Sequence, residues 1–451
     1  MVKVIFIDPL GNGRRIFRHL HYLRDWSGAF IPGYIPFPPL DLLYAATYLK
    51  QKGCDVKIIE ASIKHLPHRK VVEILKRDNP DFIVIPSTYF SLEDDKYLAG
   101  LIRDSIPCVK IVFCGPLATY EPSLFLSDDN ADFVALGELE SPMLNIIREN
   151  YSENIAYKDQ GKIKYGTRKL LDLAELPIPD RSLIDNQAYK YAIVNRRNPV
   201  TVMTISRGCP HSKCKFCSAR FYTLDQIRYR NLTAITDEIK EIVYKYNINE
   251  IFFRDQTFTA NRDLIVKICN FIISNNIDIS WRASTRVDFV DKELLILMKQ
   301  AGCYQISFGF ESASQTALDM INKGITVEQS KQAAKLAKDA GLEVVGNFLF
   351  GMLGETKDSI KKIFEFVLEL DVDYAQFNEI YLLPGTDEYD KFIQDKSYFL
   401  PRPYMKRCAM AAYLKFYLRP KYLLKQLKKI KSLYDLKFLI KSGVDELMFH
   451  L

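Results

Sequence analysis

Three cysteines lie within nine residues near the middle of the chain, in the stretch Cys209-Pro-His-Ser-Lys-Cys214-Lys-Phe-Cys217. An apolar, β-branched run at 199–206 and the turn Arg207-Gly208 precede them, which indicates a loop at the end of a buried strand. Three thiols on one loop can bind one soft metal centre. A closed zinc site normally takes four ligands, and no second Cys or His pair follows at zinc-finger spacing. Three thiols instead suit an iron–sulfur cluster that leaves one iron open for a small molecule.

Other interpretations of this stretch stay open at the level of the residues. Half of a zinc site would use the same thiols, and the grouping could be a coincidence. His211 could supply a fourth ligand, but only two residues from Cys209 it would strain the loop.

The cysteine stretch resembles the loop of the radical S-adenosylmethionine (SAM) superfamily, in which three cysteines hold a 4Fe–4S cluster and SAM chelates the fourth iron. The spacing differs by one residue, because the superfamily has C-x3-C-x2-C and Cys209, Cys214 and Cys217 give C-x4-C-x2-C. A wider turn can absorb the added residue, and Phe216 keeps the aromatic residue that usually precedes the last ligand. The resemblance therefore assigns these three cysteines to a 4Fe–4S cluster.

The chain between residues 199 and 390 alternates strand-like and helical stretches. This alternation predicts parallel strands with right-handed crossovers, and six strands rather than eight indicate a partial barrel that is open on one side. Functional groups in such barrels lie at the C-terminal strand ends. The predicted strands are 200–206, 250–254, 278–284, 303–310, 343–351 and 373–382, and the predicted helices are 234–246, 263–274, 292–301, 326–340 and 357–370.

Polar residues and glycines follow these predicted strands. Carboxylates suit the cationic groups of SAM, an arginine suits its carboxylate, and glycines let the backbone approach its adenine. The resemblance places Asp255 and Thr257 near the amino-acid part of SAM and Arg286 at its carboxylate. It places Gly351 and Gly354 at the adenosine. Two plainer interpretations stay open: Arg286 forms a rim salt bridge with Asp288, or Glu311 caps a helix. The residues assigned to SAM are Asp255, Thr257, Arg286, Glu311, Ser312, Gly351 and Gly354.

The first 150 residues show the same alternation with near-continuous apolar strands. That pattern predicts a parallel sheet with helices on both faces, and such sheets bind ligands beyond the carboxyl ends of the strands, at the switch in strand order. The predicted strands are 2–8, 55–60, 81–86, 109–115 and 132–137, and the predicted helices are 39–52, 69–79, 92–106, about 121–128 and 139–150.

Small and hydroxyl residues stand at the ends of these first strands. They could admit a bulky ligand or simply form turns. The stretches 38–44, 115–122 and 137–141 resemble the cobalamin-binding domain that precedes many radical SAM domains, although Cys114-Gly-Pro-Leu117 stands where the family commonly has Gly-Gly-Pro-His. The chain has no Asp-x-His-x-x-Gly, so we expect no histidine on the lower face of cobalamin. The residues assigned to cobalamin are Ser87, Thr88, Gly115, Pro116, Gly137 and Glu138.

Two further regions complete the chain. Residues 151–198 are polar, and Pro177 and Pro179 favour an extended linker. Residues 391–451 are predicted to be helical and basic, because 401–451 hold twelve Lys and Arg against three acidic residues. Leu423, Leu427 and Ile430 would share one face of a basic amphipathic helix. That helix could pack on its own domain, as the resemblance to the family's Phe-Tyr-x-Arg-Pro tail favours, or lie on an anionic membrane; nucleic acid is expected least.

The cellular compartment is also predicted from composition. The nine cysteines are an odd number and lie mostly within strand or helix patterns, which favours the reducing cytoplasm. The N-terminus enters a strand without a cleavage site, so we expect no signal peptide.

The complete pattern predicts an α/β protein: a Rossmann-like doubly wound sheet (1–150), a linker (151–198), a partial (β/α)6 TIM-like barrel (199–390) and a helical tail (391–451). The resemblance implies a cobalamin-dependent radical SAM methyltransferase acting on an unactivated carbon. In that family the cluster, reduced by a flavodoxin- or ferredoxin-like donor, cleaves SAM to a 5′-deoxyadenosyl radical, and methylcobalamin supplies the methyl group. A cyclase or rearrangement enzyme, a tRNA-modifying enzyme and a corrinoid or cluster sensor are the alternatives. The sequence does not indicate whether the substrate is a small molecule, a peptide or a lipid.

Overall fold

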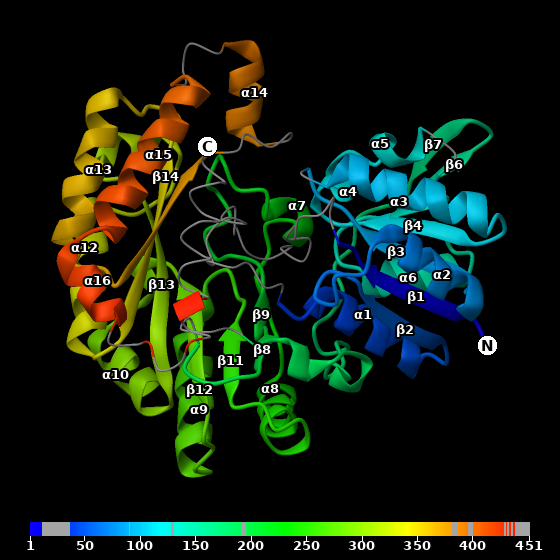
Figure 1. Ribbon diagram of the computed structural model, residues 1–451, viewed down its shortest axis with the longest axis horizontal. Helices are drawn as coiled ribbons and strands as arrows, with labels where there is room; N and C mark the ends of the chain where they lie inside the picture. The colour runs from blue at the N-terminus through cyan, green and yellow to red at the C-terminus, as the bar shows by residue number, and fades with distance from the viewer. Residues whose placement is uncertain are drawn as a thin grey trace. The chain divides into compact units, whose positions relative to one another are not determined.

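The protein is described from a computed structural model (Figure 1). The structure describes residues 1–10, 37–89, 91–127, 130–190, 195–380, 386–395 and 400–427, together with 430, 433, 436 and 437. These residues form two compact units. Unit 1 contains the described residues up to Tyr189 and the segment Ala219–Glu241, and unit 2 contains Lys190–Ser218 and the described residues from Ile242 onward.

Unit 1 is built on a seven-stranded sheet of order β2-β1-β3-β4-β5-β6-β7. The first five strands are parallel, which confirms the predicted Rossmann-like sheet, and their order matches the flavodoxin-like doubly wound arrangement. The order reverses between β1 and β3, so the ligand-binding crevice is expected beyond these strand ends. The parallel strands are β1 (Lys3–Asp8), β2 (Asp55–Glu60), β3 (Phe82–Pro86), β4 (Lys110–Cys114) and β5 (Phe133–Ala135).

Two pairs of helices cover this sheet. One pair packs α1 against α6, and α1 is buried along nearly its whole length, while the other pair packs α2 against α3 over the apolar core. Two short helices, α4 and α5, follow β4. The helices are α1 (Leu40–Gln51), α2 (His68–Asp78), α3 (Leu92–Ser105), α4 (Pro116–Tyr120), α5 (Ser123–Leu126) and α6 (Glu140–Ile147).

The predicted extended linker 151–198 is wrong over its first part. A hairpin of β6 (Ile155–Asp159) and β7 (Lys162–Tyr165) adds two antiparallel strands to the edge of the sheet. The turn residues Gln160 and Gly161 have φ of 47° and 76°, the left-handed conformation that tight hairpins require. Most of the hairpin is exposed, so it carries no run of apolar residues that would have predicted it.

A segment that the sequence placed in the barrel belongs to unit 1. It contains α7 (Arg220–Thr223), β10 (Arg228–Tyr229) and α8 (Leu232–Lys240), and α7 packs against α4. Glu238 holds the segment in place, because its buried carboxylate pairs with both Arg181 and Arg230 at 2.6 Å. The predicted helix 234–246 therefore ends in a wider π-helical turn, Glu241–Lys245, at the boundary of the units.

Unit 2 contains a six-stranded parallel sheet of order β15-β14-β13-β12-β11-β8, which confirms the predicted partial barrel. Its strands are β8 (Val200–Met203), β11 (Glu250–Phe253), β12 (Ser280–Thr285), β13 (Cys303–Glu311), β14 (Glu343–Phe350) and β15 (Tyr374–Glu379). A two-residue strand, β9 (Ser206–Arg207), precedes the cysteines. The main helices are α9 (Arg262–Ser274), α10 (Lys292–Gln300), α12 (Val327–Asp339) and α13 (Lys357–Glu369); two shorter ones, α11 (Gln315–Met320) and α14 (Asp387–Gln394), were not predicted.

The C-terminal region divides into two helices of different character, α15 (Arg402–Tyr417) and α16 (Pro420–Leu427). Helix α15 covers the edge strand β15, as Figure 1 shows. The Tyr413 hydroxyl accepts a hydrogen bond from the Phe377 backbone N–H at 2.9 Å, and the Tyr417 hydroxyl donates to the Ala375 carbonyl at 2.7 Å. These tyrosines satisfy backbone groups that an uncovered edge would present to other chains.

Helix α16 packs Tyr422 against Phe416 and Tyr417 of α15 but leaves its leucines exposed. Leu423, Leu424 and Leu427 are 42%, 60% and 56% exposed, so the packing expected for the face of Leu423 and Leu427 is wrong. Pro420 begins a separate helix because its ring cannot continue the preceding one. Lys428 and Lys429 lie outside the described residues. None of the helices in the described part of the chain has the length and hydropathy needed to cross a bilayer.

Candidate active site

The cysteine loop begins after β8 and β9, at the carboxyl end of the barrel sheet. The fully buried Asp255, at the end of β11, fixes the backbone that leads into the loop. Its carboxylate accepts hydrogen bonds from the Ser206 backbone N–H and hydroxyl, both at 2.6 Å, and from the Ile205 N–H at 3.1 Å. Asp255 was assigned to the amino-acid part of SAM, and its observed contacts make it a positioning residue for the cysteine loop.

The extra loop residue is absorbed in a left-handed turn. Ser212 has a φ of 44°, and its hydroxyl donates to the Cys209 carbonyl at 2.6 Å. The Cys217 N–H then donates to the Cys214 carbonyl at 3.1 Å, which closes the second turn. The widened spacing therefore produces a compact loop closed by its own hydrogen bonds.

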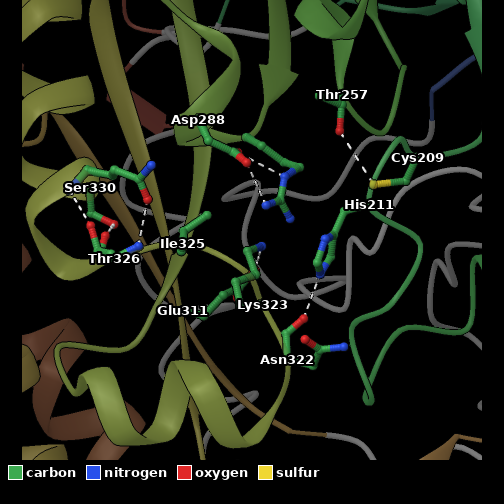
Figure 2. A network of polar contacts seen from close by, with 12 residues as sticks. Cys209, His211, Thr257, Asp288, Glu311, Asn322, Lys323, Ile325, Thr326 and Ser330 are labelled. Carbon is green, nitrogen blue, oxygen red and sulfur yellow. Dashed lines mark hydrogen bonds and ion pairs between the residues drawn. The ribbon is translucent and has the colours of Figure 1, made fainter.

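The three thiols share one electrostatic environment. The pKa of the Cys214 thiol is raised to about 12, mainly by burial; the neighbouring Cys209 and Cys217 add to the increase, and the cations Lys323 and Arg286 oppose it. Figure 2 shows Cys209 pointing toward Thr257, whose hydroxyl lies 3.7 Å from the sulfur. Thr257, assigned to SAM, therefore contacts a cysteine of the loop directly.

The ligands available at the cysteine loop bear on the two metal centres considered above. Across the described residues, no three His, Cys, Asp or Glu side chains are arranged to hold a single metal ion. A tetrahedral zinc site with Zn–S bonds of about 2.3 Å needs its sulfurs within roughly 4 Å of one another. Each cysteine of a cubane cluster binds its own iron, so its sulfurs lie farther apart. The described residues therefore form no closed zinc site at these thiols, and three thiols on one loop are the donor set of a cluster that leaves one iron open.

Arg286 forms the ion pair that the plainer interpretation expected. Its guanidinium binds the Asp288 carboxylate through two hydrogen bonds of 2.9 Å. Burial by itself would lower the pKa of Arg286, but the bonds to Asp288 outweigh it and raise the pKa. The arginine is thus fixed close to the cysteine loop, and its assignment to the SAM carboxylate stays a prediction.

Glu311 adopts an unusual backbone conformation at the end of β13. Its φ is 65°, next to a bulge in the pairing with β14, and its carboxylate accepts a hydrogen bond from the Lys323 ammonium at 2.8 Å. Both side chains are less than a tenth exposed. The helix-cap interpretation is wrong, because the N-cap of α11 is Ser314. Strained residues of this kind concentrate at functional sites.

Glu355 is a site residue that the sequence analysis missed. Its buried carboxyl accepts hydrogen bonds from the Gly351 N–H at 2.6 Å and from the Ser312 hydroxyl at 3.1 Å, so it joins the ends of β13 and β14. Burial raises its pKa to about 8. The neighbouring Gly354 was assigned to SAM, but the Ser312 partner of Glu355 lies 43 residues away and leaves no local signal in the sequence.

The two glycines assigned to the adenosine are required by packing. Gly351 has a φ of 88°, and a Cβ there would lie 1.6 Å from the Met405 sulfur. Gly354 has a φ of 81°, and its Cβ would lie 2.1 Å from the Met320 sulfur. Methionine side chains thus occupy the space over both glycines, and no adenosine contact follows from their conformation.

In unit 1, the strand end after β4 combines a close-approach glycine with a buried hydroxyl. Gly115 follows β4 with a φ of 107°, and a Cβ there would lie 2.5 Å from the carbonyl oxygen of Ser87. Ser87 is fully buried, and its hydroxyl has no hydrogen-bond partner in the described structure. Its neighbour Thr88 is held by a 3.0 Å contact with the Ser91 hydroxyl, and Pro116 begins α4. A buried donor without a partner beside a close-approach glycine fits a large polar ligand such as cobalamin.

The end of β5 continues this surface. Gly137 has a φ of 80°, its N–H donates to the Thr119 hydroxyl at 2.9 Å, and a Cβ there would lie 2.3 Å from the Arg168 guanidinium. Glu138, assigned to cobalamin, forms an ion pair with Arg228. The sequence analysis missed Arg168 and Arg228, since both come from segments that looked like linker or barrel. Residues 11–13, at the end of the first predicted strand, lie outside the described residues.

Comparisons with known proteins agree with this geometry. Residues 203–367 match the radical SAM superfamily, and residues 34–147 match the B12 binding domain. The uncharacterized methyltransferase PH0819 of Pyrococcus horikoshii is 32% identical, over 86% of this chain and 90% of that protein. The anaerobic magnesium-protoporphyrin IX monomethyl ester cyclase of Rubrivivax gelatinosus is 28% identical, over 84% of this chain and 70% of the cyclase.

A solved structure shares the fold. OxsB, a cobalamin-dependent S-adenosylmethionine radical enzyme with aqua-cobalamin and SAM bound, superposes with a TM-score of 0.67 at 20% identity. The match covers 88% of this chain and 56% of the OxsB chain, so this chain spans little more than half of that protein. The chain belongs to the radical SAM superfamily and carries a B12-binding domain; it is an enzyme whose cofactors are a 4Fe–4S cluster, SAM and cobalamin.

Proposed function

We propose that this enzyme transfers a methyl group to an unactivated carbon of its substrate. The observation that carries the proposal is the pairing, in one chain, of a three-thiol loop closed by its own hydrogen bonds with the buried Ser87 hydroxyl, which lies beside Gly115 and has no hydrogen-bond partner in the described structure. When bound, the cluster supplies the electron that cleaves SAM, and cobalamin supplies the methyl group. A relative named as a methyltransferase supports this assignment.

The residues of this chain would divide the work into holding and positioning. Cys209, Cys214 and Cys217 would hold the cluster, while Asp255 and Glu355 fix the backbone around it. The ion pairs Arg286–Asp288 and Lys323–Glu311 present charges of both signs near the thiols, where the amino and carboxylate groups of SAM need partners.

In unit 1, Ser87, Gly115 and Gly137 would form the contact surface for cobalamin, with Thr88 and Pro116 fixing its edge. The hydroxyl of Ser87 would donate to the cofactor, because it has no other partner in the described structure. Gly115 and Gly137 let the Ser87 backbone and the Arg168 guanidinium approach closely, which would fix the lining of this surface.

The products of SAM distinguish methyl transfer from other radical reactions. Protein purified and reconstituted without oxygen would be incubated with SAM, a low-potential reductant, hydroxocobalamin and candidate substrates. Methyl transfer requires S-adenosylhomocysteine to form alongside 5′-deoxyadenosine. Formation of 5′-deoxyadenosine with no S-adenosylhomocysteine in the presence of a consumed substrate would contradict the proposal.

A radical cyclase is the second candidate, because one relative over most of this chain is named as a cyclase. It would use the same cofactors and would consume a single SAM for each turnover without forming S-adenosylhomocysteine. The electron would come from a flavodoxin- or ferredoxin-like donor. None of the nine cysteines forms a disulfide in the described part of the chain, which suits the reducing cytoplasm.

We also propose that α16 contacts an anionic membrane surface. Its three exposed leucines lie in a segment, 401–451, that has twelve basic and three acidic residues. Flotation with phosphatidylglycerol vesicles should recover the full chain, and replacing Leu423, Leu424 and Leu427 by Ser should abolish the recovery. Leu414→Ser, at a leucine 40% exposed on α15, is the matched control. Equal recovery with neutral phosphatidylcholine vesicles would contradict the charge argument.

A further inference from the structure

The cysteine loop rests on one short segment of the barrel, Ile321–Gly324, which we call the loop cradle. The cradle connects α11 to α12, and its surroundings fix it at both ends. At one end the Ile321 N–H donates to the Ala317 carbonyl at 3.1 Å, and at the other Thr326 begins α12 with a complete capping box. A connector fixed in this way can act as a rigid support.

Two hydrogen bonds join the cradle to the backbone of the cysteine loop. The Lys215 N–H donates to the Ile321 carbonyl at 3.0 Å, and the Asn322 side-chain amide donates to the Lys213 carbonyl at 3.1 Å. These contacts lie on both sides of Cys214, so they determine where its buried sulfur points.

His211 completes the support from the loop side. Its Nε2 lies 2.6 Å from the Asn322 carbonyl, and Figure 2 shows the ring directed at that oxygen. A carbonyl can only accept, so Nε2 carries the proton and donates. The same ring covers Gly324, where φ is 68° and a Cβ would lie 2.7 Å from Cε1 of His211. The His211 imidazole thus lies over Gly324, in space that any side chain at position 324 would occupy.

The cradle is also tied to the rest of the barrel. Lys323 pairs with Glu311 at 2.8 Å, and that pair connects the cradle to the strained end of β13. Displacement of the cradle would therefore disturb the cysteine loop and the strand end together.

We propose that the loop cradle positions the enlarged cysteine loop for its cluster, with His211 and Asn322 as positioning residues. In this arrangement His211 lies in the four-residue interval between Cys209 and Cys214 and holds that interval against Asn322 and Gly324. The inference rests on the cluster assigned to this loop by the proposed function.

The decisive comparison uses two glycine variants of the full chain. Gly324→Ala inserts a methyl group against the His211 ring, whereas Gly341→Ala has a similar φ of 75° but finds its nearest atom, in Lys299, at 3.7 Å. Both variants carry the same backbone strain, and only the first disturbs the cradle. We expect Gly324→Ala to lose at least half of the iron per chain after anaerobic reconstitution and to shift the electron paramagnetic resonance spectrum of the reduced cluster. Gly341→Ala should match the parent chain in both measurements.

His211→Ala is the second variant, and it removes the imidazole without introducing a clash. Losing one net hydrogen bond shifts an opening equilibrium roughly fivefold, so Cys209 and Cys217 of the cluster-free protein should be alkylated about fivefold faster. Combining His211→Ala with Gly324→Ala removes the clash, so the double variant should resemble His211→Ala and not add to it. Parent-like alkylation and resonance spectra in both single variants would overturn the inference.

The alkylation measurement also separates the two proposals. If the parent chain binds no iron, the proposed function fails, and faster alkylation in His211→Ala would then show only that the cradle holds the cysteine loop in place. If the parent chain binds a cluster and the variants behave like it in every measurement, the cradle fails and the proposed function stands.

Discussion

The strand ends of the two units are organised in opposite ways. In unit 1, Gly115 and Gly137 allow the Ser87 carbonyl and the Arg168 guanidinium to approach the ends of β4 and β5 closely, and the buried Ser87 hydroxyl has no partner in the described structure. In unit 2, the ends of β11 and β13 carry the acids Asp255 and Glu311, and each is bound to groups of the protein itself.

This difference separates two ways of preparing a site. Unit 1 offers backbone and an unsatisfied donor to a ligand that arrives preformed, so its geometry depends on glycine conformations. Unit 2 uses buried charges to hold loops in place, so its geometry depends on hydrogen bonds between distant segments. The acids Asp255 and Glu311 at the barrel strand ends are therefore supports of the protein itself, and substitutions should separate this role from ligand contact.

The largest effect is expected at the cysteine loop. Cys214→Ala removes a cluster ligand, so we expect loss of the cluster absorption and of reductive SAM cleavage. Cys269→Ala, at a fully buried thiol in α9, should cost about 1 kcal/mol of stability and leave the cluster intact. Iron content and 5′-deoxyadenosine formation measure both outcomes. Retention of a full cluster in Cys214→Ala would show that the loop does not bind iron through this thiol.

The next largest effect is expected at Gly115, which follows β4 in unit 1. Gly115→Ala places a Cβ 2.5 Å from the Ser87 carbonyl at a positive φ, whereas Gly53→Ala has a φ of 89° and no atom within 4 Å. Both substitutions lower the folding stability by about 1 kcal/mol or more because of the positive φ. Only Gly115→Ala should also displace the surface proposed to contact cobalamin. We expect its affinity for hydroxocobalamin to fall by roughly a hundredfold, about 2.7 kcal/mol. Titration calorimetry on both variants measures the difference, and equal affinities would refute it.

The sequence predicted the elements of both units from local pattern. Continuous apolar runs such as 81–86 and 303–310 gave β3 and β13 within a residue or two, because buried parallel strands need such runs. The hairpin β6–β7 was missed because its faces are exposed, and α7 because a four-residue helix has no periodicity to detect.

The roles of individual site residues could be predicted less well. The sequence placed Asp255 and Ser312 at strand ends correctly, but their partners lie at Ser206 and Glu355, 49 and 43 residues away. Long-range partners depend on how the chain packs, and no local pattern encodes them. Glycines with a positive φ at a strand end were easier to identify, since a glycine such as Gly115 indicates its own backbone conformation.

A smaller effect, dependent on pH, tests the supporting role of a buried acid in unit 2. Burial raises the pKa of Glu355 from 4.5 to about 8, so folding favours its protonated form. Its stabilising contribution is fully present below about pH 4.5 and is lost as the pH rises through 8. Glu355→Gln keeps the hydrogen-bonding shape without the charge, so between pH 5 and 9 the parent chain should lose on the order of 4 kcal/mol relative to the variant. Urea denaturation across this range measures the difference. Parallel pH profiles for the two chains would contradict the assigned role.

The smallest effect is expected at Glu138 in unit 1, which forms a largely buried ion pair like those at the strand ends of unit 2. Glu138 follows Gly137 after the end of β5, but its largely buried carboxylate is bound by Arg228. Glu138→Gln should therefore cost about 2 kcal/mol of stability, because the arginine loses its counter-charge, while cobalamin affinity stays within about twofold. Glu153→Gln is the matched control, since its pair with Lys169 is exposed and worth at most about 0.5 kcal/mol. If Glu138→Gln instead weakened cobalamin binding as strongly as Gly115→Ala, Glu138 would be a ligand contact, and the contrast between the two kinds of strand end would not hold for β5.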